Sequence, residues 1–435
     1  MDWKQHYRSR LTTADEAVKH IKHGSRVLIE DTIAEPAILV DAMVANRDHF
    51  RDIEFTQMIS FRGVKTQPYL EPGMEKHFSM NAFMIGPTTR TTFAEGRMDF
   101  STSFYGSLPN VYRTIKPLDA ALVQVTPPDD EGFCSLGVCV CYTRVAVDTA
   151  KLVIAEVNDQ MPYTYGDSKI HVSQIDYFIE NSHPLIEVPQ GKLNDISLEI
   201  GRHCAELIED RSCLQLGMGS IPDAVLACLD DKKDLGIYAE LYSDGVLDLY
   251  EKGVITGKYC GTHPGIIAAA VLLGTKRLYD FCHKNPLTHF YPIDYMNNVN
   301  NIAKNDRMIS INGCAQVDLY GQVVSEFING KQYTGVGGQV DFVRGAAMSK
   351  GGKSLLCMPS TADGGKISKI TTTLPAGTIV TTTRNDVDYI VTEYGYARLK
   401  GLTNRERARA LINIAHPNFR AQLTDEYEQL HRVSL

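Results

Sequence analysis

The sequence has no block of lysine or arginine and no long apolar run, and each absence limits what the protein can do. Its 435 residues carry 44 Lys and Arg against 52 Asp and Glu, a net charge of −8, so no broad basic surface is available for nucleic acid or an anionic membrane. No apolar run approaches the about 18 residues of a membrane-spanning helix, and the first residues, MDWKQHYRSRLTTADE, lack the apolar core of a signal peptide. We therefore expect a cytoplasmic protein without nucleic-acid or membrane partners, whose small acidic substrates would bind through local positive groups.

The usual metal-binding patterns are missing as well. The ten cysteines include no C-x-x-C pair, and the 13 histidines include no H-E-x-x-H and no His–Cys cluster. We expect reduced cysteines, most of them in the core, and no metal. Cys139 and Cys141 form a C-x-C pair in GVCVCYT, whose alternation predicts that both lie on one face of a strand, where packing is favoured over metal binding.

Apolar patterning predicts an α/β protein. Length and a hydrophobic content of 43% favour two or three domains with substantial cores. Helical patterns cover residues 14–22, 36–45 and 222–229. Strand-like runs cover residues 26–29, 53–59, 120–125, 151–157, 213–216, 235–241, 308–311, 355–358, 378–382 and 389–391. Alternation of strands with helices predicts parallel or mixed sheets covered by helices.

The order strand, loop, Pro-led helix and strand occurs twice. Placing Pro36 on Pro222 aligns the first strands without a gap, and a connection shorter by four residues in the second copy brings Met58 opposite Glu240. Residues 181–196 contain two prolines, a glycine and few periodic apolar positions, which is typical of a boundary. The sequence therefore predicts two related α/β lobes, residues 1–188 and residues 189–435.

Glu240 is the candidate catalytic acid. It lies in LGIYAELYSDGVLD, which we interpret as a short buried strand that delivers a carboxylate to its C-terminal end, where open α/β sheets bind ligands. A carboxylate becomes a useful covalent catalyst when it attacks an activated acyl group such as a thioester. Taken alone, Glu240 is more simply interpreted as an acid that caps the helix starting near Gly245 or pairs with a lysine.

Two glycine loops follow strand-like segments, at residues 217–219 and 335–338. Each exposes backbone N–H groups and allows close approach of a phosphate or an oxyanion. The third glycine of a dinucleotide fingerprint is replaced by Pro222 in one loop and by Val340 in the other. This disfavours a dehydrogenase, and for the first loop a plain tight turn stays open.

Several ordered segments carry a family resemblance. They are SIPDAV at 220–225, GIYAELYSDGVLDLY around Glu240, GTKRLYDF at 274–281, GVGGQVDFVRGA at 335–346, ISKI at 367–370, VTEYGYARLKG at 391–401 and RARALINIAHPNF at 407–419. Together they resemble the acetyl-CoA hydrolase/transferase family. The segments ADEAV at 14–18, AEP at 34–36 and VNDQ-P at 157–162 are most similar to its 4-hydroxybutyrate CoA-transferases.

The resemblance implies a CoA-transferase-like fold with its active site in a cleft between the two lobes. It implies that Glu240 becomes a glutamyl–CoA thioester, that the loop 335–338 donates N–H groups to the thioester oxygen, and that the Asn312 amide completes this oxyanion hole. Residues implied to line the CoA channel are Gly217, Gly219, Gly335, Gly337, Gly338, Phe342, Arg344 and Lys369. Without the resemblance, Arg344 and Lys369 would be interpreted as solvated surface charges.

Other polar residues receive weaker assignments. Glu393 also ends a predicted strand, but the family pattern gives it no catalytic role, so we interpret it as structural or as a pocket wall. Four residues of the first lobe are expected to face the acyl end of the substrate: Arg90, Glu95, Ser107 and Pro109.

The predicted activity is transfer of CoA from a short acyl-CoA, such as acetyl-CoA or butyryl-CoA, to 4-hydroxybutyrate, butyrate or acetate through a glutamyl–CoA intermediate. CoA is then a substrate, with no tightly bound cofactor, and the resemblance implies a homodimer. Two alternatives stay open: an acyl-CoA hydrolase on the same scaffold, and a non-catalytic CoA-binding protein. No motif reads chain length or a hydroxyl group.

Overall fold

The computed structural model describes residues 2–435, which form two compact units. The first unit contains Met1–Val188 and Ala268–Met296, and the second contains Pro189–Ile267 and Asn297–Leu435. The predicted second lobe ran without interruption from residue 189, whereas the structure assigns the segment 268–296 to the first unit. Contacts inside that unit explain why: Arg113 Nη1 lies 2.7 Å from Asp294 Oδ2, and Val140 N–H donates to the Ala270 carbonyl.

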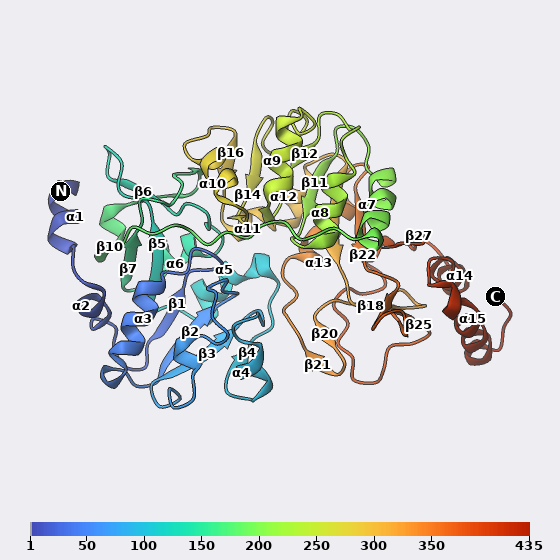
Figure 1. Cartoon of the computed structure of the whole chain (residues 1–435), viewed down its shortest axis with the longest axis horizontal. Coiled ribbons are helices and arrows are strands. Elements are labelled where there is room, and N and C mark those ends of the chain that lie inside the picture. Colours follow the sequence, from blue (N-terminus) through green and yellow to red (C-terminus); the bar gives the residue numbers. More distant parts are fainter. Residues whose placement is uncertain (1) are drawn as a thin grey trace. The chain divides into compact units, whose positions relative to one another are not determined.

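The first unit is built on a seven-stranded parallel sheet in the order β10-β7-β5-β1-β2-β3-β4. Its strands are β1 (Arg26–Ile29), β2 (Ile53–Gln57), β3 (Phe78–Ala82), β4 (Asp99–Phe100), β5 (Ala120–Val125), β7 (Val153–Val157) and β10 (Tyr177–Glu180). β1 is the topological switch point, because later strands add to both of its sides (Figure 1). The carboxyl ends of its central strands therefore form the edge where a ligand is expected.

Short elements surround this sheet. The helices are α1 (Trp3–Arg10), α2 (Ala14–Val18), α3 (Ala37–Ala45), α4 (Arg90–Ala94), α5 (Leu108–Asn110), α6 (Thr143–Thr149), α10 (Lys276–Cys282) and α11 (Ile293–Met296). Single 3-10 turns are η1 (Arg47–His49), η2 (Pro68–Leu70), η3 (Tyr105–Ser107) and η5 (Val172–Gln174), and η4 (Val111–Ile115) is a short π-helix. Short ladders use β6 (Phe133–Ser135), β8 (Tyr165–Gly166), β9 (Lys169–His171), β14 (Ile267–Ala269), β15 (Val271–Leu272) and β16 (Thr288–Phe290).

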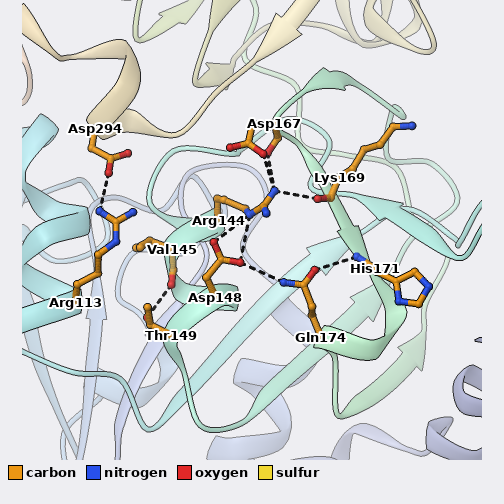
Figure 2. Close-up of polar contacts among 10 residues, drawn as sticks. All are labelled: Arg113, Arg144, Val145, Asp148, Thr149, Asp167, Lys169, His171, Gln174 and Asp294. Carbon is orange, nitrogen blue, oxygen red and sulfur yellow. Dashed lines mark hydrogen bonds and ion pairs between the residues drawn. The ribbon is translucent and has the colours of Figure 1, made fainter. Parts of the chain in front are cut away.

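Aromatic packing and one arginine hold this unit together. Phe55 and Tyr69 are fully buried with ring centroids 4.4 Å apart, and burial of one such side chain contributes about 1.5–3 kcal/mol. Figure 2 shows Arg144 of α6 beside Asp148 on its own helix and Asp167 on the arm between β8 and β9, with Nη1 2.7 Å from Asp167 Oδ1. Arg144 also donates to the Lys169 carbonyl, so this one side chain fixes the arm to α6.

The second unit has a six-stranded sheet in the order β12-β11-β17-β22-β26-β27. Its strands are β11 (Cys213–Leu216), β12 (Gly236–Ile237), β17 (Met308–Gly313), β22 (Lys353–Cys357), β26 (Tyr389–Thr392) and β27 (Gly395–Arg398). All neighbouring pairs are parallel except β26 with β27. β11 is flanked by β12 and β17, so the switch point lies at the strand that precedes the first glycine loop.

Helices and short ladders complete the second unit. The helices are α7 (Asp195–Leu207), α8 (Ser220–Ala227), α9 (Asp244–Glu251), α12 (Val299–Ala303), α13 (Gln339–Met348), α14 (Asn404–Asn413) and α15 (Pro417–His431). The remaining strands are β13 (Leu241–Tyr242), β18 (Gln316–Asp318), β19 (Val323–Val324), β20 (Phe327–Ile328), β21 (Lys331–Gln332), β23 (Thr361–Ala362), β24 (Ile367–Ser368) and β25 (Ile370–Thr371). α7 packs on α8 (Figure 1), and a Cβ on Gly201 would lie 2.6 Å from the Ala224 carbonyl oxygen. Among residues 2–435, the structure contains no helix with the length and apolar character needed to span a membrane.

Most predicted elements are confirmed, and three are wrong. Residues 378–382 form no strand; only Thr382 makes an isolated bridge, with Val323. The run 235–241 is interrupted after Ile237. Cys139 makes only an isolated bridge with Val271 and Cys141 lies in the turn before α6, so neither belongs to a strand, although both are buried with their sulfur atoms 3.2 Å apart. In each case local patterning was outweighed by tertiary contacts.

Candidate active site

Glu240 lies just beyond the carboxyl end of β12. Leu235 and Ile237 are buried, and Tyr238 N–H donates to the Leu214 carbonyl at 3.1 Å, which extends the pairing with β11 by one residue. The chain then leaves the sheet and bends at Glu240. This placement at the edge of the sheet agrees with the expected delivery of a carboxylate to a strand end.

One asparagine joins Glu240 to a second acid. Asn297, which precedes α12 and is 3% exposed, donates from Nδ2 to Glu240 Oε1 at 2.6 Å and to Asp341 Oδ2 at 3.1 Å. Because both partners are carboxylates, only the orientation that presents the NH₂ group satisfies them. Asn297 Oδ1 is buried and has no hydrogen-bond partner among residues 2–435.

Burial raises the pKa of Glu240 to about 7; the hydrogen bond from Asn297 lowers this pKa and the negative charge of Asp341 raises it. The dominant cause is loss of solvation of the carboxylate. A carboxyl group with a pKa near neutrality in a site lined by hydrogen-bond donors is a candidate functional group. The anion is the nucleophilic form of a carboxyl group, so a nucleophilic role for Glu240 would require a pH near or above this value.

The second glycine loop packs directly on Glu240. A Cβ on Gly338 would lie 1.8 Å from Glu240 Oε1 and 2.1 Å from Asn297 Nδ2. The φ of Gly338 is −102°, so it is the contact and not the backbone conformation that requires glycine here. Gly337, with φ +57°, does need the left-handed region.

Backbone donors at the start of α13 point to anion binding. Gly338 is the N-cap residue of α13, and the N–H groups of Gly337 and Gly338 donate to no atom within residues 2–435. Free N–H groups and the helix dipole at such a terminus favour a negative charge. The loop can therefore stabilise an oxyanion beside Glu240.

The side chain of Asn312 pairs with Gln215, whereas an oxyanion donor is expected beside Glu240. It is in β17, opposite Leu356 of β22, and its amide exchanges two hydrogen bonds with Gln215, at 3.1 and 3.2 Å. The amide that the structure places on Glu240 belongs to Asn297. The oxyanion role of Asn312 stays a prediction without a contact to support it.

The residues expected to line a CoA channel occupy different environments. Gly219 has φ +115° and precedes α8, and added Cβ atoms on Gly217 and Gly219 would meet no atom within 4 Å, so this loop leaves open space. The side chain of Phe342 is fully buried. It is a core residue of α13 rather than a channel wall, because it has no surface to offer a ligand.

The two expected cations differ. Arg344 is half-exposed and pairs with Asp386, with Nη2 3.1 Å from Oδ2. Lys369 lies between β24 and β25, and its Nζ makes no hydrogen bond or ion pair with residues 2–435. Lys369 is thus available to a phosphate, whereas Arg344 would have to share its guanidinium with Asp386.

Glu393 behaves as a structural acid. Its two carboxylate oxygens accept hydrogen bonds from the backbone N–H and the hydroxyl of Ser360, at 2.8 and 2.6 Å. These bonds tie the turn after β26 to the segment after β22, and they leave Glu393 without a role that the site requires.

The residues expected at the acyl end lie in the first unit. Arg90 begins α4, and Glu95 follows α4 with Oε2 2.7 Å from Arg97 Nη2. Ser107 ends η3, and Pro109 is buried in α5. Their assignment to an acyl pocket remains a prediction.

Among residues 2–435, one group combines metal-ligand types: Asp31, Cys139 and Cys141. Asp31 already accepts hydrogen bonds from the N–H groups of Thr32 and Ile59 and from the hydroxyl of Tyr105. Its carboxylate is thereby used to fix the loop after β1. We assign this buried group a structural role.

Comparisons with known proteins identify the family. The N-terminal domain model of acetyl-CoA hydrolase/transferase matches residues 1–188, and the C-terminal domain model matches residues 274–427. The chain is 51% identical to the 4-hydroxybutyrate coenzyme A transferase of Clostridium kluyveri over 99% of this chain and 100% of that protein. The chain belongs to the acetyl-CoA hydrolase/transferase family.

Two solved structures support the fold. The structure of a 4-hydroxybutyrate CoA-transferase from Porphyromonas gingivalis is 41% identical and superposes with a TM-score of 0.86, covering 99% of this chain and 100% of that chain. RipA from Yersinia pestis is 34% identical with a TM-score of 0.94, covering all of both chains. The predictions of the family, of the CoA-transferase enzyme class and of a two-lobed α/β fold are confirmed.

Sequence reasoning missed Asn297 and the contact made by Asp341. Asn297 stands in YMNNVN, where Asn298 is the N-cap of α12, so the pair reads as helix-capping chemistry. Asp341 belongs to the segment GVGGQVD that was singled out for its glycines. Its position in the first turn of the helix that follows the glycine loop was the available signal.

Proposed function

We propose that this enzyme transfers CoA from a short acyl-CoA to 4-hydroxybutyrate, or in the reverse direction to acetate or butyrate, through covalent intermediates on Glu240. The 51% identity to a 4-hydroxybutyrate coenzyme A transferase over almost the whole chain supports this choice of substrate class. CoA is a substrate and a transient covalent partner rather than a bound cofactor.

The chemistry conserves the thioester. Glu240 Oε attacks the acyl carbonyl carbon, the carbon–sulfur bond breaks, and CoA leaves as a thiolate with the electron pair. The thiolate then attacks the glutamyl carbonyl carbon of the anhydride, and the first acid leaves as a carboxylate. A second carboxylate reverses these steps. No net proton, ATP or metal is required.

The contact set of Glu240 carries the proposal. Its carboxylate has an amide donor at 2.6 Å and the Gly338 backbone against it. Each addition step places a negative charge on an oxygen of the reacting carbonyl, and donors already in position stabilise that charge without reorganisation. In this proposal Gly338 N–H and Asn297 Nδ2 supply the donors, and Asn297 takes the role first expected of Asn312.

We assign CoA binding to those predicted channel residues that are accessible. Lys369 has an unpaired ammonium group, and the open loop 217–219 allows close approach of a phosphate. Arg344, which pairs with Asp386, is assigned the weaker contribution. Phosphates lie far from the reacting carbon, so these contacts act mainly on binding.

A panel of acceptor acids tests the substrate assignment. Isotope-labelled acetate, butyrate, 4-hydroxybutyrate and itaconate are assayed with acetyl-CoA as donor, and kcat/KM is compared. The proposal expects 4-hydroxybutyrate and butyrate to be used well and itaconate poorly. Preference for a dicarboxylate would contradict the substrate assignment while leaving the transfer chemistry intact.

An acyl-CoA hydrolase on the same scaffold is the rival. In that case water takes the anhydride, so CoA release would not respond to added carboxylate. The proposal expects added butyrate to divert acyl-CoA consumption into butyryl-CoA. A cytoplasmic homodimer completes the proposal, and light scattering of the purified protein tests the assembly.

A further inference from the structure

We propose that Asp341 is a positioning residue that keeps the Asn297 amide presenting its N–H groups to Glu240 throughout the catalytic cycle, and thereby protects the transfer reaction from hydrolysis. This inference rests on the proposed function of Glu240. It deepens that function by assigning a role to a residue that never touches the reacting atoms.

The geometry is a three-residue chain. Asn297 Nδ2 lies between two carboxylate oxygens, 2.6 Å from Glu240 Oε1 and 3.1 Å from Asp341 Oδ2. One NH₂ group supplies both donors, so the second hydrogen bond fixes the direction of the first. Asn297 is 3% exposed, and no solvent is at hand to hold its amide in place.

Asp341 is needed because the charge on Glu240 is temporary. While Glu240 is ionised, its own charge holds the NH₂ group. Once Glu240 is an anhydride or a thioester it is neutral, and a free amide can rotate and present Oδ1 to the reacting carbonyl instead. Oδ1 would repel the oxyanion that forms there. Asp341 forms no covalent bond in the cycle, so its carboxylate oxygen stays available to Asn297 Nδ2 and the donor orientation persists in every state.

The position of Asp341 suits this role. It is the third residue of α13, in the first turn after Gly338, where the helix terminus favours a negative charge. One helix start therefore supplies both the loop that packs on Glu240 and the acceptor that orients the amide. Asp341 is the charged group that shifts the pKa of Glu240. Asn297, which faces Glu240 from the segment before α12, is neutral.

Loss of Asp341 has two separate consequences. The negative charge raises the pKa of Glu240, so its removal moves the acid limb of the pH–rate profile to lower pH. Loss of orientation slows thiolate attack on the glutamyl carbonyl, and the anhydride then lives longer in the presence of water. The ratio of hydrolysis to transfer should rise at least about tenfold, the effect of one hydrogen bond to a charged group.

The experiment compares Asp341→Ala, which removes the acceptor as well as the charge, with the parent enzyme. Acetyl-CoA is supplied with butyrate, and free CoA and butyryl-CoA are measured over a range of pH. Asp388→Ala is the matched control: Asp388 is a buried acid of the same unit, paired with Arg398, and lies outside the catalytic and CoA-binding residues. We expect the Asp341 variant to show both changes and the control to show neither.

A double-mutant cycle separates positioning from general damage. In an Asn297→Ala background, Asp341→Ala should no longer raise the hydrolysis ratio, because there is no amide left to orient, but it should still shift the acid limb. If Asp341→Ala does not fold, Asp341→Leu serves in its place. A folded variant with an unchanged hydrolysis ratio would overturn the inference, even if its acid limb moves. Absence of any Glu240 adduct in the parent enzyme would instead overturn the proposed function beneath it.

Discussion

Replacement of Gly338 by alanine is the most severe small change that the structure predicts. A Cβ at this position would stand 1.8 Å from Glu240 Oε1 and 2.6 Å from its Cδ, whereas ordinary contacts begin at 3.4 Å. The Glu240 carboxylate must therefore move by more than about 1 Å, and a misplacement of about 1 Å costs roughly a hundredfold in rate. Loss of the aligned N–H donor costs about a hundredfold to a thousandfold.

We expect Gly338→Ala to lower kcat at least about a hundredfold while the protein stays folded. The φ of −102° is acceptable to alanine, so the loss of stability comes only from displacing Glu240 and Asn297 and should be about 1–3 kcal/mol. Gly191→Ala is the control, because an added Cβ there meets no atom within 4 Å. Exchange of acetyl-CoA with labelled acetate measures both. A folded Gly338→Ala enzyme with normal exchange would refute the placement of this loop against the nucleophile.

Three further outcomes follow from the same contacts. Asn297→Ala removes the hydrogen bond that lowers the pKa of Glu240. The acid limb of the pH–rate profile, near pH 7 in the parent, should therefore move to higher pH, and kcat should fall about tenfold to a hundredfold. An acid limb that does not move would contradict this contact. Lys369→Ala should raise KM for acyl-CoA more than it lowers kcat, and Arg344→Ala should do so less strongly because of its pairing with Asp386; unchanged KM in either would show that its cation does not grip CoA. All ten cysteines are free and most are buried, so a thiol reagent should find ten thiols in the unfolded chain and few in the native one, and a count of eight would reveal a disulfide.

The framework of both sheets was predictable because each strand carries its own signal. Residues 26–29, 120–125 and 213–216 are short apolar runs bounded by turn residues, and each forms the predicted strand. Runs that depend on distant partners were not predictable. Residues 378–382 have strand-like composition but find only an isolated bridge, since β-propensity records the fit to neighbours more than the backbone itself.

The candidate site divides in the same way. Glu240 and the loop 335–338 could be picked out because acid, turn and glycine chemistry are local features, and the structure brings these two segments into contact. Asn297 could not, because an asparagine before a helix reads as a cap until a carboxylate 57 residues away is seen against it. The full burial of Phe342 could not be predicted either, because it depends on the packing of α13 and not on the motif.

Covalent trapping at Glu240 tests the central claim most directly. The enzyme is incubated with acetyl-CoA without an acceptor acid and then reduced with borohydride, which converts a glutamyl thioester into an alcohol. Peptide mass spectrometry should place this conversion on the peptide that contains Glu240. Freshly prepared Glu240→Gln should bind CoA but form no adduct and no longer exchange acyl groups. An unmodified Glu240 peptide in an enzyme that still exchanges acyl groups, with intersecting double-reciprocal plots for the two substrates, would contradict the covalent mechanism.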